Sequence, residues 1–264
     1  MNSILLAIIL VAGIGLLIGL ILSIASIIMA VPKDEKAEKI LEALPGANCG
    51  ACGYSGCSGY AAALAKGKAE VGLCAPGGLA CTKEISSILG VASGNVEPKT
   101  AVVKCMGSLD HTAYKAEYVG IQSCAAAVKI GGGLTACSYG CMGLGDCQAV
   151  CKYDAISVCN GVAYIDSDRC RACTLCVKAC PRGIISIVPK KEMALIRCSN
   201  RDKGGVTRKL CSVGCIGCKK CEKTCEAGAV KVTDFNAYVT PELCTGCGKC
   251  VEACPQHCIT YFNG

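Results

Sequence analysis

CRACTLCVKACP at residues 170–181 and CTGCGKCVEACP at residues 244–255 share a single spacing, C-x2-C-x2-C-x3-C-P. Three cysteines in one short loop surround a cubane [4Fe-4S] cluster, and the fourth, before proline, binds a neighbouring cluster. The two segments therefore predict eight cluster ligands. These are Cys170, Cys173, Cys176, Cys180, Cys244, Cys247, Cys250 and Cys254.

Zinc and disulfides are the other uses of closely spaced cysteines. Zinc sites also contain C-x2-C pairs but need neither the third cysteine nor the trailing Cys-Pro. The chain has 27 cysteines in 264 residues, and many lie three positions apart, where disulfide geometry cannot pair them all. The pattern favours iron–sulfur clusters and a reducing compartment.

An internal repeat organises the C-terminal half. Adding 74 to nine cysteine numbers gives nine further cysteines without a gap, so each copy resembles a two-cluster ferredoxin. Short apolar runs at 155–158, 162–165, 229–232 and 237–239 predict small β-hairpins. The matched positions are Cys124, Cys137, Cys141, Cys147, Cys151, Cys170, Cys173, Cys176 and Cys180 with Cys198, Cys211, Cys215, Cys221, Cys225, Cys244, Cys247, Cys250 and Cys254.

The two copies differ where Leu144 stands in place of a cysteine equivalent to Cys218. The first copy could hold a three-iron cluster, or another thiolate could fill the gap, and Cys137 is the nearest candidate. With the fourth cysteines exchanged, the expected sets are Cys137, Cys141, Cys147 and Cys180; Cys151, Cys170, Cys173 and Cys176; Cys215, Cys218, Cys221 and Cys254; and Cys225, Cys244, Cys247 and Cys250.

A further motif precedes the repeat. ALPGANCGACGYSGC at residues 43–57 and CAPGG at 74–78 give the spacing C-x2-C-x4-C-x16-C. Glycines among the sulfurs allow a close approach of the backbone to a cluster, and the alanine-rich segment 58–67 predicts a helix. One self-contained cluster is expected on Cys49, Cys52, Cys57 and Cys74.

Four further cysteines could bind a sixth cluster or could be buried small apolar residues. These are Cys105, Cys124, Cys198 and Cys211. The remaining Cys81, Cys159 and Cys258 are interpreted as small apolar packing residues, and His111 and His257 as surface or turn residues.

The N-terminus is long enough for a membrane span. Ile4 to Ala30 is free of charge, and its helical length of about 40 Å exceeds a hydrocarbon core of about 30 Å. No basic region precedes it, unlike a signal peptide. Lys33, Lys36 and Lys39 follow, so the positive-inside rule predicts that the bulk of the chain is cytoplasmic.

Charge gives little evidence for nucleic-acid binding. The formal charge is +7, but each cubane with four thiolates contributes about −2, so five clusters would make the total negative. No basic stripe with aromatic residues occurs, and no dinucleotide fingerprint is present. NAD is expected to bind elsewhere.

The N-terminal helix, the ALPGANCGACGYSGC and CAPGG block and the ferredoxin motifs together resemble the B subunit of the Rnf complexes. The resemblance covers essentially the whole chain. It implies an electron-relay subunit of a membrane-bound ferredoxin:NAD+ oxidoreductase that translocates Na+ or H+. The implied partners are the other subunits and reduced ferredoxin. An iron–sulfur subunit of a hydrogenase or formate-oxidising complex is the alternative.

The expected fold class is α+β. It comprises a transmembrane anchor (1–31), a membrane-proximal [4Fe-4S] domain (32–98), a first ferredoxin-like module with an N-terminal extension (99–192) and a second module (193–264). The second module carries an excess of basic over acidic residues. Lys219, Lys220 and Lys223 are expected to form the docking face for ferredoxin, and a solvated loop is the alternative.

Overall fold

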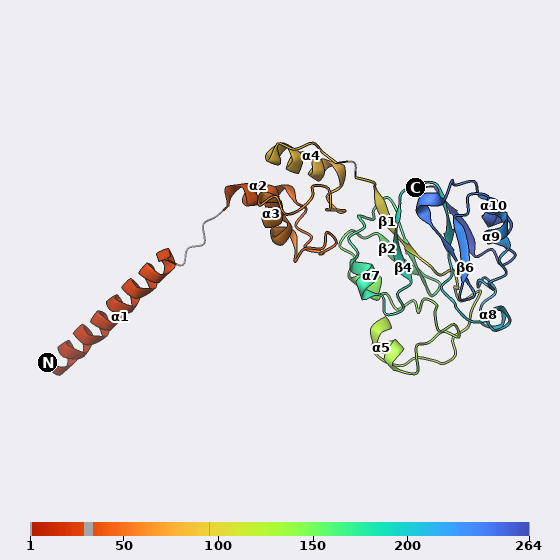
Figure 1. The fold of residues 1–264 in the computed structure, drawn as a ribbon. Coiled ribbons are helices and arrows are strands. Elements are labelled where there is room, and N and C mark those ends of the chain that lie inside the picture. Colours follow the sequence, from red (N-terminus) through yellow and green to blue (C-terminus); the bar gives the residue numbers. More distant parts are fainter. Residues whose placement is uncertain (1, 29–33, 95, 264) are drawn as a thin grey trace.

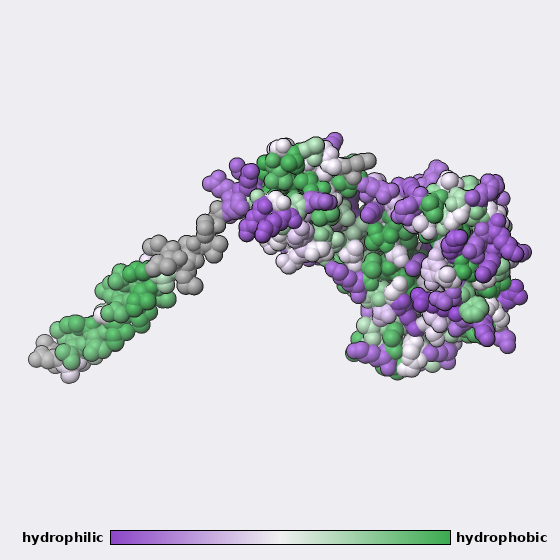
Figure 2. Space-filling model, in the orientation of Figure 1, coloured by the Kyte–Doolittle hydropathy of each residue, from purple (hydrophilic) through white to green (hydrophobic). Residues whose placement is uncertain are grey.

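The computed structural model describes residues 2–28, 34–94 and 96–263. It is a mixed α+β structure that begins with one apolar helix, α1 (Asn2–Ile28). Leu5–Ser26 of this helix is apolar and long enough to cross a membrane and is not buried in the protein. The helix stands apart from the other elements and is apolar along its visible face (Figures 1 and 2). Of the segment expected to be helical, residues 29 and 30 lie outside the described residues.

Three helices form a small unit after α1. They are α2 (Glu35–Ala43), α3 (Cys57–Ala65) and α4 (Gly78–Leu89). The side chain of Asp34 accepts hydrogen bonds from the first-turn amides of α2, which satisfies backbone donors that have no helical partner. Ile40, Leu64 and Ile85 pack together in its core. Helix α3 confirms the prediction of a helix in the alanine-rich segment.

Two short hairpins repeat at the predicted places. β2 (Ile156–Cys159) pairs with β3 (Val162–Ile165), and β6 (Val230–Thr233) pairs with β7 (Asn236–Val239), both antiparallel. The predicted strands are confirmed with shifts of about one residue. Each hairpin turns through two residues of positive φ, residues 160–161 and 234–235, as a two-residue turn requires.

Two further antiparallel pairs were not predicted, because their strands are far apart in the sequence. β1 (Lys99–Val103) pairs with β4 (Ile185–Pro189), and β5 (Met193–Ile196) pairs with β8 (Ile259–Phe262). Val103 is opposite Ile185, and Ile196 is opposite Ile259. Since Ile185 and Ile259 are equivalent positions of the internal repeat, β1 and β5 occupy the same place in the two copies.

Short helices carry the third cysteine of each ferredoxin-like loop. They are α6 (Asp146–Ala149), α7 (Leu175–Ala179), α9 (Lys220–Thr224) and α10 (Lys249–Glu252). Each follows a residue in the left-handed conformation: Gly145, Thr174, Lys219 and Gly248. This turn directs the next cysteine inward, and all four of these cysteines are buried. The other helices are α5 (Cys124–Lys129), α8 (Gly204–Leu210) and the 3-10 turn η1 (Pro241–Leu243).

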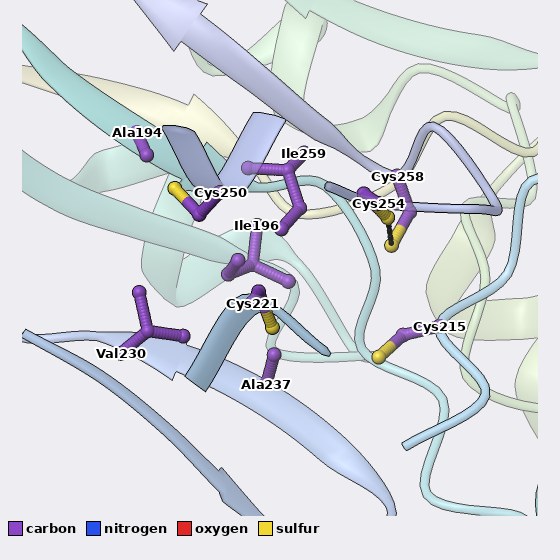
Figure 3. Close-up of a cluster of buried hydrophobic side chains, with 10 residues drawn as sticks. All are labelled: Ala194, Ile196, Cys215, Cys221, Val230, Ala237, Cys250, Cys254, Cys258 and Ile259. Carbon is purple, nitrogen blue, oxygen red and sulfur yellow. Dashed lines mark hydrogen bonds between the residues drawn. The ribbon is translucent and has the colours of Figure 1, made fainter. Parts of the chain in front are cut away.

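Each ferredoxin-like module packs its apolar side chains around cysteine sulfurs. In the second module, Ile196, Val230 and Ile259 surround Cys221 and Cys250 (Figure 3). The two modules meet where Val102 and Val188 pack against Met193 and Leu195. Along the molecule, the three-helix unit follows α1, and the second module lies farthest from the N-terminus (Figure 1).

Candidate metal-cluster sites

All 27 cysteines lie in the described part of the chain, and every one is a free thiol. Within that part, no three His, Cys, Asp or Glu side chains are arranged to hold a single metal ion. The cysteines instead gather around small cavities and within the apolar cores. We number the groups site 1 to site 6 in their spatial order from the three-helix unit to the second module.

Site 1 lies in the three-helix unit and contains Cys49, Cys52, Cys57 and Cys74. Cys52, Cys57 and Cys74 belong to its core. Asn48, with φ of 48°, accepts a hydrogen bond from the amide of Cys57 at 2.9 Å. This bond closes the loop between the first three cysteines of the motif.

Cys49 faces the first ferredoxin-like module. The ammonium group of Lys178 donates a hydrogen bond to the carbonyl of Cys49 at 3.0 Å, and Lys152 donates to the carbonyl of Ala47 at 3.2 Å. Burial and the nearby Cys173, Cys49 and Cys74 raise the pKa of Tyr153. These contacts join the motif of site 1 to the module that carries site 2.

Site 2 contains Cys151, Cys170, Cys173 and Cys176. Burial, followed by Cys170, Cys173 and Cys151, raises the pKa of Cys176 to about 11, so the four sulfurs are electrostatic neighbours. The amide of Ala101 on β1 donates to the sulfur of Cys170 at 3.3 Å. The structure therefore places Cys151 near the loop into which its exchange is predicted.

Site 3 differs from the sequence prediction in one residue. Its cavity is lined by Cys124, Cys141, Cys147 and Cys180, with Cys124 where Cys137 was expected. Burial, followed by Cys141, Cys124 and Cys180, raises the pKa of Cys147 to about 12. The structure therefore associates Cys124 with the gap at Leu144.

Asp146 explains why Cys124 occupies that place. Its carboxylate accepts hydrogen bonds from the hydroxyl of Ser123 at 3.0 Å and from the amides of Cys124 and Ala125 at 2.8 and 2.9 Å. These bonds fix the first turn of α5, where orphan amides and the helix dipole favour a carboxylate. The equivalent position in the second copy is Lys220, which cannot make this clamp.

Site 4 lies between the two modules and contains Cys105, Cys137, Cys198 and Cys211. All four line one cavity. The predicted sixth set contained Cys124 where the structure has Cys137. Cys124 and Cys137 thus occupy each other's predicted sites, because hydrogen bonds to Asp146 hold the backbone of Cys124 at site 3.

One pair of cysteines matched by the sequence repeat, Cys124 and Cys198, is not equivalent in the structure. Cys105 lies two residues after the end of β1, and Cys198 lies two residues after the end of β5. The sulfur of Cys105 accepts from the amide of Cys141 at 3.4 Å, and that of Cys198 accepts from the amide of Cys215 at 3.2 Å. Cys105 is thus the structural equivalent of Cys198, and the match of Cys124 with Cys198 in the sequence repeat is not structural.

In the second module, the structure brings together the cysteines of the two predicted sets, which we call sites 5 and 6. Cys215, Cys218, Cys221 and Cys254 line the cavity of site 5. In site 6, burial and then Cys244, Cys225 and Cys247 raise the pKa of Cys250. Cys218 and Cys247 are exposed, so both sites reach the surface.

The three remaining cysteines have different surroundings. Cys258 is buried with its sulfur 3.6 Å from that of Cys254 (Figure 3), and its hydrogen bond lowers the pKa of Cys254 to about 5. Cys81 is buried, and its hydrogen bond with Cys74 lowers the pKa of Cys81. Cys159 is exposed, so its interpretation as a packing residue is wrong.

The surroundings of the sulfurs fit an anionic group. Backbone amides point at Cys105, Cys170 and Cys198, and hydrogen bonds to sulfur are a means by which proteins stabilise and tune iron–sulfur clusters. The Nε atoms of Arg182 and Arg197 are buried without hydrogen-bond partners among the described residues. Arg182 lines site 3 and Arg197 lines site 4, so each places positive charge beside four thiols.

Sequence reasoning did not identify Asp146, Arg182 or Arg197 as parts of these sites. The signal for Asp146 was present in Ser123, a typical helix N-cap residue placed directly before Cys124. Asp146 itself stands in a separate segment, at the start of α6, and no local pattern connects it with Ser123.

Comparisons with known families agree with this arrangement. An Fe-S cluster family model matches residues 44–76, a 4Fe-4S binding domain matches residues 163–186, and a 4Fe-4S dicluster domain matches residues 214–259. The fold and the grouped cysteines define a multi-cluster iron–sulfur protein.

Three similar proteins cover almost the whole chain. The B subunit of the Na(+)-translocating ferredoxin:NAD(+) oxidoreductase complex of Acetobacterium woodii is 37% identical over 98% of this chain and 78% of its own length. The B subunit of an ion-translocating oxidoreductase complex of Methanosarcina acetivorans is 38% identical over 98% and 99%. The B subunit of the proton-translocating ferredoxin:NAD(+) oxidoreductase complex of Clostridium ljungdahlii is 35% identical over 98% and 93%. The chain belongs to the family of iron–sulfur B subunits of the ion-translocating ferredoxin:NAD+ oxidoreductase (Rnf) complexes.

Proposed function

We propose that the chain relays electrons from reduced ferredoxin at its second module to the membrane subunits of an Rnf complex. The observation that carries the proposal is the contact between successive sites. Lys178, which lies two residues after Cys176 of site 2, is hydrogen-bonded to the carbonyl of Cys49 in site 1. Sites 2 and 3 share one apolar core, and sites 5 and 6 share another.

Sites 1, 2, 5 and 6 have complete sets of motif cysteines, and site 3 has three motif cysteines together with Cys124. When bound, a [4Fe-4S] cluster supplies a one-electron carrier. The protein would hold the cluster on four thiols at each site. The surrounding apolar side chains limit its contact with water, an amide reaches the sulfur of Cys170 in site 2, and Arg182 lines site 3. The proposed domain division remains 1–31, 32–98, 99–192 and 193–264.

The apolar helix α1 supports a membrane anchor for this relay. Its exposed apolar side chains would be stable in the hydrocarbon core. The basic residues 33, 36 and 39 that follow support an orientation with all six sites on the cytoplasmic side. In this orientation site 1 is the site nearest to the membrane.

The second module has features that support it as the place where electrons enter. Cys218 of site 5 is exposed, and the side chains of Lys219, Lys220 and Lys223 beside it are also exposed. Basic side chains around an accessible site would attract an acidic ferredoxin and increase the rate of association.

Charge reversal at these three lysines tests the docking face. The variant Lys219→Glu/Lys220→Glu/Lys223→Glu is expected to slow reduction by ferredoxin by about tenfold or more at low salt, because favourable steering becomes repulsion. Stopped-flow absorbance across a salt series measures the rate. The matched control reverses Lys66, Lys68 and Lys83, which are exposed on the three-helix unit. Equal rates for the two triple variants at every salt concentration would reject this face.

A further inference from the structure

Site 4 is built from the same two positions of each module. Cys105 and Cys198 each follow the first strand of their module by two residues. Cys137 and Cys211 are related by the internal sequence repeat. Cys105, Cys137 and Cys211 are buried, and Cys198 is partly buried. Two modules that meet with matching cysteine pairs create one four-thiol site that neither module contains alone.

The hydrogen bonds around this site repeat in the same way. The sulfur of Cys105 accepts from the amides of Cys141 and Gly107. The sulfur of Cys198 accepts from the amides of Cys215 and Asn200. In each pair, the first amide belongs to the first cysteine of a neighbouring cluster loop, in site 3 or in site 5.

Three further observations indicate that the cavity receives an anionic group. The side-chain amide of Asn200 donates to the sulfur of Cys137 at 3.4 Å. The buried Nε of Arg197 has no hydrogen-bond partner among the described residues and belongs to a side chain that lines the cavity. A Cβ on Gly107 would lie 3.3 Å from the sulfur of Cys211 and 3.7 Å from that of Cys105, so glycine keeps this wall open.

We propose that Cys105, Cys137, Cys198 and Cys211 bind a sixth [4Fe-4S] cluster shared by the two modules. It would connect site 3 with site 5, which no other cysteine group among the described residues links. The inference rests on the relay proposed above and completes its path across the module interface. It also accounts for four thiols that would otherwise lie together without a role in a reducing compartment.

The test begins with metal analysis of the full chain, purified anaerobically in detergent. Six cubanes correspond to about 24 Fe per chain and five to about 20. We expect the higher value and no stoichiometric zinc. A chain with about 20 Fe, with or without one zinc, overturns the sixth cluster but leaves the five-cluster relay intact. Iron far below that level contradicts both proposals.

Single and double variants then test whether the two modules share the cluster. Cys105→Ala and Cys211→Ala should each lose about four Fe, and the double variant should also lose about four, because both residues bind the same cubane. The matched control Cys159→Ala alters an exposed cysteine outside the six sites and should lose none. Spin counting by EPR after reduction provides a second readout. A loss of about eight Fe in the double variant, or unchanged iron in both single variants, would contradict a shared site. If a variant fails to fold, the iron content of the unmodified chain still decides the proposal.

Discussion

The Cys124→Ala variant is expected to lose the cubane of site 3, about four Fe per chain, or to retain only a three-iron remnant with its own EPR signal. Cys124 lines site 3 with Cys141, Cys147 and Cys180. Removal of one thiol leaves three ligands, since Leu144 stands where the second copy has Cys218. The measurement is iron content combined with EPR of the oxidised and reduced chain.

A rescue variant makes this prediction specific. Leu144 packs in the same apolar group as Cys124, and its position carries a cysteine in the usual spacing. Leu144→Cys in the Cys124→Ala background is therefore expected to restore about four Fe. Full iron content in Cys124→Ala, or no recovery in the double variant, would show that Cys124 is not the fourth ligand of site 3.

The Gly143→Ala variant is expected to destabilise the first module by about 2–5 kcal/mol, the combined cost of a left-handed alanine and of overpacking. Gly143 has φ of 70°, and an added Cβ would lie 2.7 Å from backbone atoms of Gly161. Backbone cannot move aside as a flexible side chain can. The loop concerned follows Cys141, so the variant should also release iron from site 3 at lower denaturant concentration.

Gly183→Ala is the matched control, because it places an alanine in the left-handed conformation but creates no steric clash. Gly183 has φ of 61°, and no atom lies within 4 Å of the added Cβ. The equivalent residue in the second copy is His257, which adopts φ of 48°. We expect a cost of about 1 kcal/mol. Guanidinium unfolding followed by circular dichroism compares the two variants, and equal midpoints would contradict the close packing of Gly143 against Gly161.

The sequence was most informative where the ligands of a site are neighbours along the chain. The loops that begin at Cys170 and Cys244 could be predicted because three candidate ligands follow one another at every third position, and this spacing constrains the shape of the loop. The hairpins at 156–165 and 230–239 could be predicted from apolar runs separated by turn residues, which is also a local pattern. None of these inferences required a long-range contact.

Prediction failed where chain proximity and spatial proximity differ. Cys137 is close to Cys141 in the chain and seemed the natural substitute at Leu144, whereas Cys124 reaches site 3 because Asp146 caps α5. The pairing of β1 with β4 places Cys105 beside Cys141, which belongs to a distant loop of the chain. These two long-range contacts set the composition of sites 3 and 4, and neither has a periodic signature in the sequence.

The central claim is that this chain carries electrons and does not itself reduce NAD+. The most direct test mixes the iron-loaded, purified chain with reduced ferredoxin and NAD+ under anaerobic conditions. We expect the visible absorbance of the clusters to decrease after mixing, because ferredoxin reduces them. We expect no more NADH than in a control with iron-free chain. NADH formation in step with ferredoxin oxidation, or the absence of any bleaching, would contradict the account.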